Sequence, residues 1–123
     1  ADCVTPKATV ALLRAMRQRD DWPVFRNALP GLGIDGTTAE AVGPDSPARG
    51  KAFGKTGTLV YGNGLGGTLL RSKALAGVLT TKGGRELVYA MMVNDVPLPA
   101  GVPTSREGKV LGRLCEIVVE HGP

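Results

Sequence analysis

The sequence has few of the residues that build metal centres, nucleic-acid surfaces or membrane spans. Its 123 residues include one histidine and two cysteines, with no Cys-x-x-Cys pair, so the usual zinc-binding spacings are excluded. Lys and Arg (15) exceed Asp and Glu (11), but no basic run is interleaved with aromatic residues, which make up 4% of the chain. No segment approaches the roughly 20 apolar residues of a membrane helix. We therefore expect no metal, no cofactor, no nucleic-acid partner and no membrane span.

The composition that remains is typical of a small globular domain. Hydrophobic residues make up 42% of the chain and charged residues 21%, with a formal net charge of +4. This balance allows one modest hydrophobic core. The chain begins with Ala1 and shows no signal peptide, so we expect it to be part of a longer polypeptide.

The two cysteines, Cys3 and Cys115, lie near opposite ends of the sequence. In an exported protein a disulfide between them could join the N-terminal segment to the last helix; two separate buried thiols are the alternative. The single histidine, His121, is expected at a helix C-terminus, where the partial negative charge favours it.

Residues 1–42 are predicted to be mainly helical. Thr5 and Pro6 are typical of a helix start, because threonine caps free amides and proline fits the first turn. The spacing that follows predicts one buried face, made of Thr9, Leu12, Leu13 and Met16. A second helix is expected from Trp22-Pro23, after Asp20-Asp21, with Phe25 and Leu29 in the core and an end at Pro30-Gly31. Next come a turn at Asp35-Gly36-Thr37, one helical turn from Thr38 to Val42, and a loop from Gly43 to Gly50.

Residues 51–94 have the pattern of antiparallel strands. The first strand is expected to end at Thr58–Tyr61, followed by a connection over Gly62–Gly67 and strands over Lys73–Thr81 and Glu86–Val93. Gly83-Gly84 suits a tight hairpin because both glycines tolerate positive φ. The apolar run Ala90–Val93 predicts a central strand covered on both faces.

A final helix is predicted over residues 104–121, capped by Ser105. Its expected apolar stripe consists of Leu111, Leu114, Cys115, Val118 and Val119. Helices, then antiparallel strands, then a helix predict an α+β fold in which helices pack on an antiparallel sheet, within a single segment over residues 1–123.

The stretch Gly54-Lys55-Thr56-Gly57-Thr58 suggests an anion site, for a phosphate or for a carboxylate. A phosphate-binding loop requires four residues between its first glycine and Gly-Lys-Thr, and it must open a helix. Only three residues follow Gly50 before the motif, and β-branched residues come after it, so a carboxylate is favoured. The alternative without function is that Lys55 and the threonines simply lie on an exposed strand.

A second glycine pattern could indicate a dinucleotide site. Gly62, Gly64 and Gly67 satisfy Gly-x-Gly-x-x-Gly, but such a site also requires a crossover helix and a correctly placed acid. The pattern therefore favours a glycine-rich hairpin loop.

The motif and the segments around it resemble one enzyme family. Lys55-Thr56-Gly57-Thr58 is followed by Ala74–Val78, a Gly-Gly hairpin and Leu87–Asn94, and is preceded by Val4-Thr5-Pro6 and Asp35-Gly36-Thr37. This ordered set is similar to the serine penicillin-binding proteins, more narrowly to the low-molecular-mass class C D-alanyl-D-alanine carboxypeptidase/endopeptidase family. The resemblance covers nearly the whole chain. It implies the C-terminal part of a β-lactamase/transpeptidase-like fold.

The resemblance also implies roles for four residues. Lys55 would supply positive potential and a contact in the proton network, and Thr56 would bind the substrate carboxylate. Gly57 would leave clearance for a peptide along the strand edge, and the backbone N–H of Thr58 would form half of an oxyanion hole. The implied partners are peptidoglycan D-alanyl peptides, β-lactams in the intact enzyme and the missing N-terminal portion of the same protein. The implied location is the periplasm, the cell envelope or the extracellular space.

The family's nucleophile motif, Ser-x-x-Lys, does not occur in the chain. None of its three serines has lysine at that spacing; they are Ser46, Ser72 and Ser105. Tyr61-Gly62-Asn63 spells a variant of the family's second motif, but in the wrong order, and we interpret it as chance. We therefore expect part of a serine carboxypeptidase that is inactive alone, with a strand edge left uncovered. The alternative is a non-catalytic module that binds D-alanyl peptides or a protein partner.

Overall fold

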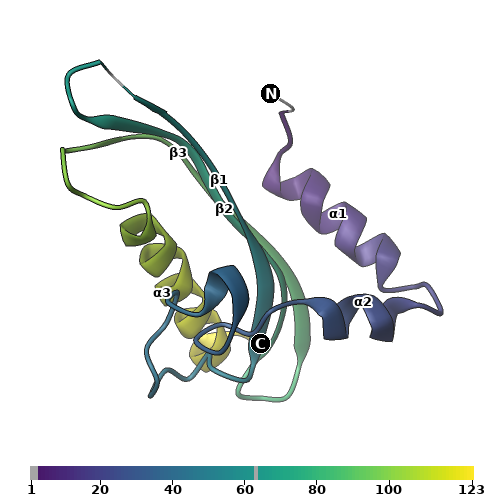
Figure 1. Ribbon diagram of the computed structural model, residues 1–123. Coiled ribbons are helices and arrows are strands. Elements are labelled where there is room, and N and C mark those ends of the chain that lie inside the picture. Colours follow the sequence, from purple (N-terminus) through teal and green to yellow (C-terminus); the bar gives the residue numbers. More distant parts are fainter. Residues whose placement is uncertain (1–2, 63) are drawn as a thin grey trace.

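The computed structural model of the protein describes residues 3–62 and 64–123 and has an α+β fold. The elements are α1 (Pro6–Met16), α2 (Trp22–Ala28), the short 3-10 helix η1 (Gly36–Thr38), β1 (Ala52–Gly62), β2 (Thr68–Thr80), β3 (Glu86–Leu98) and α3 (Ser105–His121). The strands form one antiparallel sheet, with α3 on one face and α1 and α2 toward the other (Figure 1). The predicted α+β fold with helices on an antiparallel sheet is therefore confirmed.

The strand order is β1-β2-β3, so β2 is the central strand in the part of the chain that the structure describes. β1 pairs with β2 from Ala52↔Leu79 to Gly62↔Thr68, with a register shift between Leu59 and Val60. The prediction that Ala90–Val93 forms a central strand is wrong, because these residues lie on β3, at an edge, and are only half-buried. An apolar run indicates that helices cover both faces of a strand. Such cover does not require a neighbouring strand on each side.

The second and third strands are longer than predicted. β2 begins at Thr68 instead of Lys73, and β3 continues to Leu98 instead of Val93. The added residues pair with each other from Thr68↔Leu98 to Ser72↔Asn94. Cross-strand pairing determines where these strands end. An alternating apolar pattern in the sequence does not predict that pairing.

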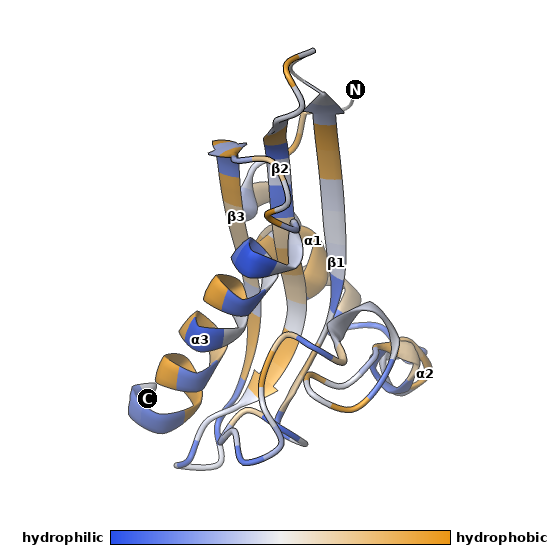
Figure 2. Ribbon diagram, turned by 60° about the vertical axis from the view of Figure 1, so that its left-hand side comes forward, coloured by the Kyte–Doolittle hydropathy of each residue, from blue (hydrophilic) through white to orange (hydrophobic). Residues whose placement is uncertain are grey.

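The main hydrophobic core lies between α3 and the sheet. Leu111, Cys115 and Val119 are each at most 3% exposed, whereas Leu114 is 42% exposed, so the real apolar stripe of α3 is narrower than predicted. Hydrophobic and hydrophilic positions alternate along this helix (Figure 2). The core cluster consists of Leu32, Ala41, Ala48, Ala52, Leu75, Leu79, Tyr89, Leu111, Cys115 and Val119.

The start of α1 is as predicted, with the Thr5 hydroxyl accepting a hydrogen bond from the Ala8 amide at 3.1 Å. Of its predicted buried face, Leu13 is buried, but Leu12 is 61% exposed. The start of α2 is also as predicted, although the Asp21 carboxylate binds Arg19 and does not cap the helix.

No residue of α2 is buried. Phe25 stacks on Trp22 with the ring centroids 5.7 Å apart, and both Phe25 and Leu29 are half-buried. These two residues therefore lie beside the core instead of inside it.

Three local predictions need correction. The helical turn expected from Thr38 to Val42 is instead the 3-10 turn η1, which ends at Thr38 because that residue's side chain is bonded into the preceding turn. In the β2–β3 hairpin only Gly84 has positive φ, at +87°, because the turn is longer than a two-residue loop. Ser105 is the first residue of α3, and its N-cap, Thr104, makes no side-chain cap hydrogen bond.

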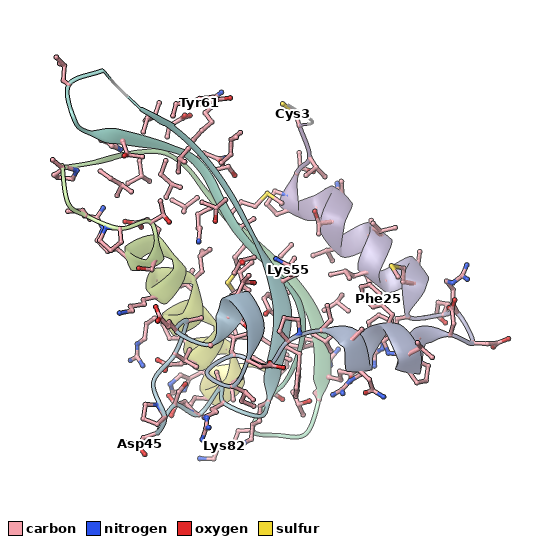
Figure 3. All side chains as sticks on the ribbon, viewed as in Figure 1. Cys3, Phe25, Asp45, Lys55, Tyr61 and Lys82 are labelled. Carbon is pink, nitrogen blue, oxygen red and sulfur yellow. The ribbon has the colours of Figure 1, made fainter. Side chains whose placement is uncertain are left out.

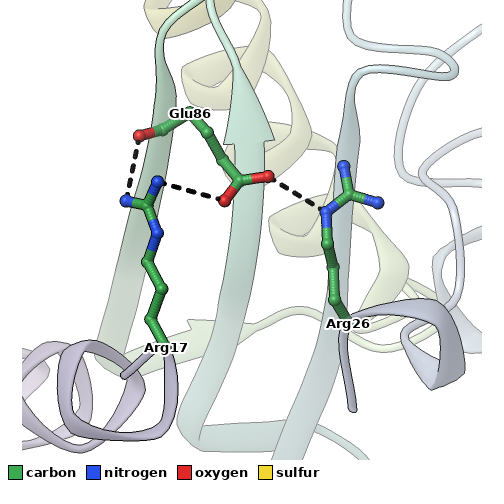
Figure 4. A network of polar contacts seen from close by, with 3 residues as sticks. All are labelled: Arg17, Arg26 and Glu86. Carbon is green, nitrogen blue, oxygen red and sulfur yellow. Dashed lines mark hydrogen bonds and ion pairs between the residues drawn. The ribbon is translucent and has the colours of Figure 1, made fainter. Parts of the chain in front are cut away.

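Glu86, the first residue of β3, links the sheet to the two N-terminal helices (Figure 4). Its carboxylate lies 3.4 Å from the Arg17 guanidinium and 3.0 Å from that of Arg26. Arg26 also stacks over the Phe53 ring at 5.3 Å from its centroid. A half-buried polar cluster therefore holds α1 and α2 to this face.

The two cysteines have different environments. Cys115 is a fully buried free thiol, and burial raises its pKa to about 11. Cys3 is exposed at the N-terminal end of the described chain (Figure 3). The disulfide alternative is therefore wrong, and the expectation of buried thiols is right for Cys115 alone. His121 is the last residue of α3, as predicted.

Candidate active-site edge

The outer edge of β1 has a covered part and an open part. The amide of Leu32 donates to the Ala52 carbonyl at 3.0 Å, and the amide of Gly54 donates to the Pro30 carbonyl at 2.9 Å. Beyond Gly54, none of the described residues pairs with this edge through the backbone. The open part begins at Lys55.

The backbone of the open part presents Thr56 and Thr58 to the outside. In an antiparallel strand both backbone groups of a residue point to the same side, and the side alternates along the strand. Since Ala52 and Gly54 bond outward, the N–H and C=O of Thr56 and Thr58 also point outward. The register shift comes only after Leu59. This edge can therefore pair with an extended peptide.

A cluster of one ammonium and two hydroxyls lies at this edge. The Lys55 Nζ donates to the Thr37 hydroxyl at 3.3 Å and to the Thr56 carbonyl at 3.0 Å. The Thr56 hydroxyl donates to the Thr37 hydroxyl at 2.8 Å. Since the Thr37 oxygen accepts from both neighbours, its own proton is available to an anion. Figure 3 shows Lys55 beside the middle of the sheet.

The loop before β1 positions Thr37. The Asp35 carboxylate accepts from the Gly31 amide at 2.6 Å, and the buried Thr38 hydroxyl lies 3.1 Å from the Gly31 carbonyl. Gly36 has φ of +58°, a conformation that side chains disfavour. The sequence predicted this turn but assigned Thr37 no role in a site. Only the fold brings it to Thr56.

Close packing of α3 holds the segment that follows this loop. A side chain at Gly112 would place its Cβ only 2.0 Å from the Ala41 carbonyl oxygen, so glycine is required there. Ala41 itself belongs to the core cluster. Helix α3 thereby holds the loop before β1, and this loop supplies Thr37 to the open edge of β1.

The two glycines of the motif have different surroundings. A Cβ on Gly54 would lie 2.5 Å from the Tyr89 hydroxyl and 2.7 Å from the Ala76 carbonyl, so this glycine is needed for packing. A Cβ on Gly57 would meet only the Ala74 Cβ, at an ordinary 3.8 Å. Packing within the chain therefore gives no reason for glycine at position 57.

Lys73 also lies at the site, although no sequence motif contains it. This residue pairs with Thr58 across the β1–β2 ladder and is only 9% exposed, and its Nζ donates to the Thr58 hydroxyl at 2.8 Å. Burial lowers the pKa of Lys73, and the nearby charge of Lys55 lowers it further. The only sequence signal is a lysine at an inward-facing position of a strand.

A cavity of about 300 Å³ lies beneath the open edge. Its wall includes Thr37, Thr56, Lys73, Glu40 and the first turn of α3. Neither Lys55 nor Lys73 forms an ion pair with any carboxylate of the described residues. The site therefore has a positive field and hydroxyl donors, which suit a carboxylate group.

The structure brings Lys55 and Thr56 together with Thr37, and it places Gly57 and Thr58 on the adjoining open edge.

The other sequence patterns have simple outcomes. The strand continues through the motif, which agrees with rejecting a phosphate-binding loop. The described glycines of the second pattern lie at or near the β1–β2 hairpin connection, as predicted. Asn63 of the Tyr-Gly-Asn pattern lies outside the described residues. None of the helices in the two described ranges is long and apolar enough to cross a membrane.

A strand edge with an ammonium and two hydroxyls, backed by a helix-covered antiparallel sheet, suits an extended peptide that ends in a carboxylate. The comparison with protein families agrees, since the model of the D-Ala-D-Ala carboxypeptidase 3 (S13) family matches residues 1–111. The chain belongs to this family of penicillin-binding peptidases, and the predicted family is thereby confirmed. Searches of curated proteins and of solved structures found no match.

Proposed function

We propose that the chain forms the substrate-anchoring wall of a serine D-alanyl-D-alanine carboxypeptidase/endopeptidase active site. The open edge of β1 carries this proposal, because Lys55, Thr56 and Thr37 meet where the outward backbone of Thr56 and Thr58 can pair with a peptide. The family's D-Ala-D-Ala carboxypeptidase character supports it.

The proposed substrate is a peptidoglycan stem peptide that ends in D-alanyl-D-alanine. Its terminal carboxylate would accept a hydrogen bond from the Thr37 hydroxyl and a second one from the Thr56 hydroxyl, whose proton would turn from Thr37 to the carboxylate, within the positive field of Lys55. The peptide would lie along the edge past Gly57, where a side chain would stand beside it. The scissile carbonyl oxygen would then face the Thr58 N–H.

The reactive serine is proposed to come from a segment outside these 123 residues, because the chain contains no Ser-x-x-Lys. The serine oxygen would bond to the scissile carbonyl carbon, its proton would pass to the leaving nitrogen, and the C–N bond would break to release D-alanine. Water would then hydrolyse the ester and return the proton to the serine. β-Lactams would acylate the same serine. The intact enzyme is proposed to act outside the cytoplasm, at the cell wall, because the proposed peptidoglycan substrate lies there.

The test uses the full-length polypeptide that contains this chain. Fluorescent penicillin should label the wild type, and Lys55→Ala should reduce labelling and D-alanine release by about 100-fold or more, in the range of a lost transition-state donor. Lys82→Ala, at an exposed hairpin position, is the matched control and should retain both activities. Full activity in Lys55→Ala would overturn the proposal.

A second function, peptide binding without chemistry, is favoured by the absence of Ser-x-x-Lys. It predicts that the 123-residue chain alone binds acetyl-D-alanyl-D-alanine and that Lys55→Ala abolishes this binding. It also predicts that the full-length polypeptide is not labelled by penicillin. Labelling would decide for the enzyme.

A further inference from the structure

Lys73 is a buried cation whose position the packing of the fold does not explain. The side chain lies against the first turn of α3, where a Cβ added to Gly108 would be 3.4 Å from the Lys73 Cε. Its ammonium donates to the Thr58 hydroxyl at 2.8 Å. The aliphatic part of the side chain fills this space, but an uncharged residue of similar length would fill it equally well.

The charges around Lys73 do not compensate its burial. On β1 the neighbouring charge is Lys55, which has the same sign. Glu40, after η1, lines the same cavity but does not form an ion pair with Lys73. At the start of α3 the charged groups are Arg106 and Glu107, which pair with each other at 2.7 Å. A buried ammonium without a carboxylate partner is unfavourable for stability.

Thr58 is the residue that Lys73 holds, and it occupies a special place on β1. Its side chain faces Lys73 on the α3 side, while its N–H points out at the open edge. The register of β1 shifts one residue later, between Leu59 and Val60. Regular pairing with β2 ends at Leu59, the next residue along β1, so the hydrogen bond from Lys73 gives Thr58 a second attachment close to this irregularity.

We propose that Lys73 is a positioning residue of the site, which holds the Thr58 side chain from inside the fold and thereby fixes the Thr58 N–H at the open edge. Its charge adds to the field of Lys55 at the same place. We call the hydrogen bond from Lys73 to Thr58 the clamp. The consequence for catalysis rests on the proposed function, whereas the clamp itself does not depend on that function.

The clamp is tested in the 123-residue chain by nuclear magnetic resonance. Lys73→Met keeps the length and removes the charge and donor; Lys82→Met, on the exposed hairpin, is the control. Carbon-detected signals of the Thr58 amide nitrogen should shift with pH in the wild type as Lys73 loses its proton. This titration should be absent in Lys73→Met and unchanged in Lys82→Met. A Thr58 signal that is the same in the wild type and Lys73→Met would overturn the proposal.

Stability separates a positioning role from a structural one. Lys73→Met should leave the urea midpoint of unfolding unchanged or raise it, because it removes an uncompensated buried charge. A large fall in the midpoint would show that Lys73 serves folding, and would overturn the proposal.

The catalytic consequence is tested in the full-length polypeptide. Lys73→Met should lower kcat for D-alanine release by about 10-fold, with a smaller change in KM, as expected for a group that acts through an oxyanion donor. Lys73→Arg should recover part of the loss. Unchanged kcat in Lys73→Met would overturn the catalytic role. If the wild type itself neither releases D-alanine nor binds penicillin, the proposed function fails, and a Thr58 response in the isolated chain would still support the clamp.

Discussion

The two faces of the sheet are built in different ways. On the α3 face, apolar side chains of the helix and sheet form a core whose members are almost all fully buried. On the other face, α1 contributes one buried residue, Leu13, and α2 contributes none. Polar contacts of Glu86 with Arg17 and Arg26 attach these helices.

The proposed site lies on the α3 side of this contrast. Thr56, Thr58 and Lys73 turn their side chains to the α3 face, which carries the packed core and, beneath the open edge, the cavity. The α1 face is held by fewer buried contacts, and such regions open more readily. We therefore expect the site to be rigid toward α3 and adaptable toward α1.

The largest expected effect comes from exchanging the two motif glycines for alanine. Gly54→Ala should lower the free energy of unfolding by about 3 kcal/mol, since its Cβ would overlap Tyr89 and the Ala76 carbonyl on the packed face. Gly57→Ala, which points to the other face, should change it by less than about 0.5 kcal/mol. Urea denaturation of both variants measures the difference. Equal losses would contradict the contrast between the faces.

An intermediate effect is expected at alkaline pH, on the α3 face. Burial raises the pKa of Cys115 from 9.0 to about 11 and also raises that of Tyr89. The unfolded chain therefore loses these protons first, and stability should fall as the pH rises from 9 toward 11, by up to about 1.4 kcal/mol per pH unit for each group.

Cys115→Ala isolates the contribution of the thiol, since it leaves Tyr89 and the opposite tendency of Lys73 in place. Urea denaturation at several pH values should show a shallower decline in this variant than in the wild type. Parallel curves for the two proteins would argue against a protonated buried thiol.

The smallest expected effect is at Glu86, on the lightly packed face. Glu86→Gln should lower the free energy of unfolding by about 1 kcal/mol, because the ion pairs are partly exposed and screened by solvent. The loss should shrink in 1 M salt. Glu120→Gln, which removes a contact at 3.8 Å to His121 and a weak charge interaction with Arg113, both exposed, is the control and should have little effect. A salt-independent loss at Glu86 would indicate packing instead of charge.

Local patterns in the sequence predicted the helix starts at Thr5 and Trp22, the hairpin around Gly84 and the strand that contains Lys55-Thr56-Gly57-Thr58. These features depend on a few neighbouring residues, whose φ, capping and apolar spacing are local properties. Strand ends and strand order were predicted less well. They depend on which strands pair with each other. The apolar run Ala90–Val93 shows that an edge strand covered by helices can be as apolar as a central strand.

The sequence by itself determined the family, the α+β class and the place of Lys55-Thr56-Gly57-Thr58 on a strand. Motifs and the spacing of apolar residues are local properties of the chain and can be recognised without the fold. Only the tertiary structure decided that Thr37 completes the hydroxyl cluster and that Lys73 lies behind Thr58. Those contacts join residues distant in sequence, and they form only when strand register and the packing of α3 bring the segments together.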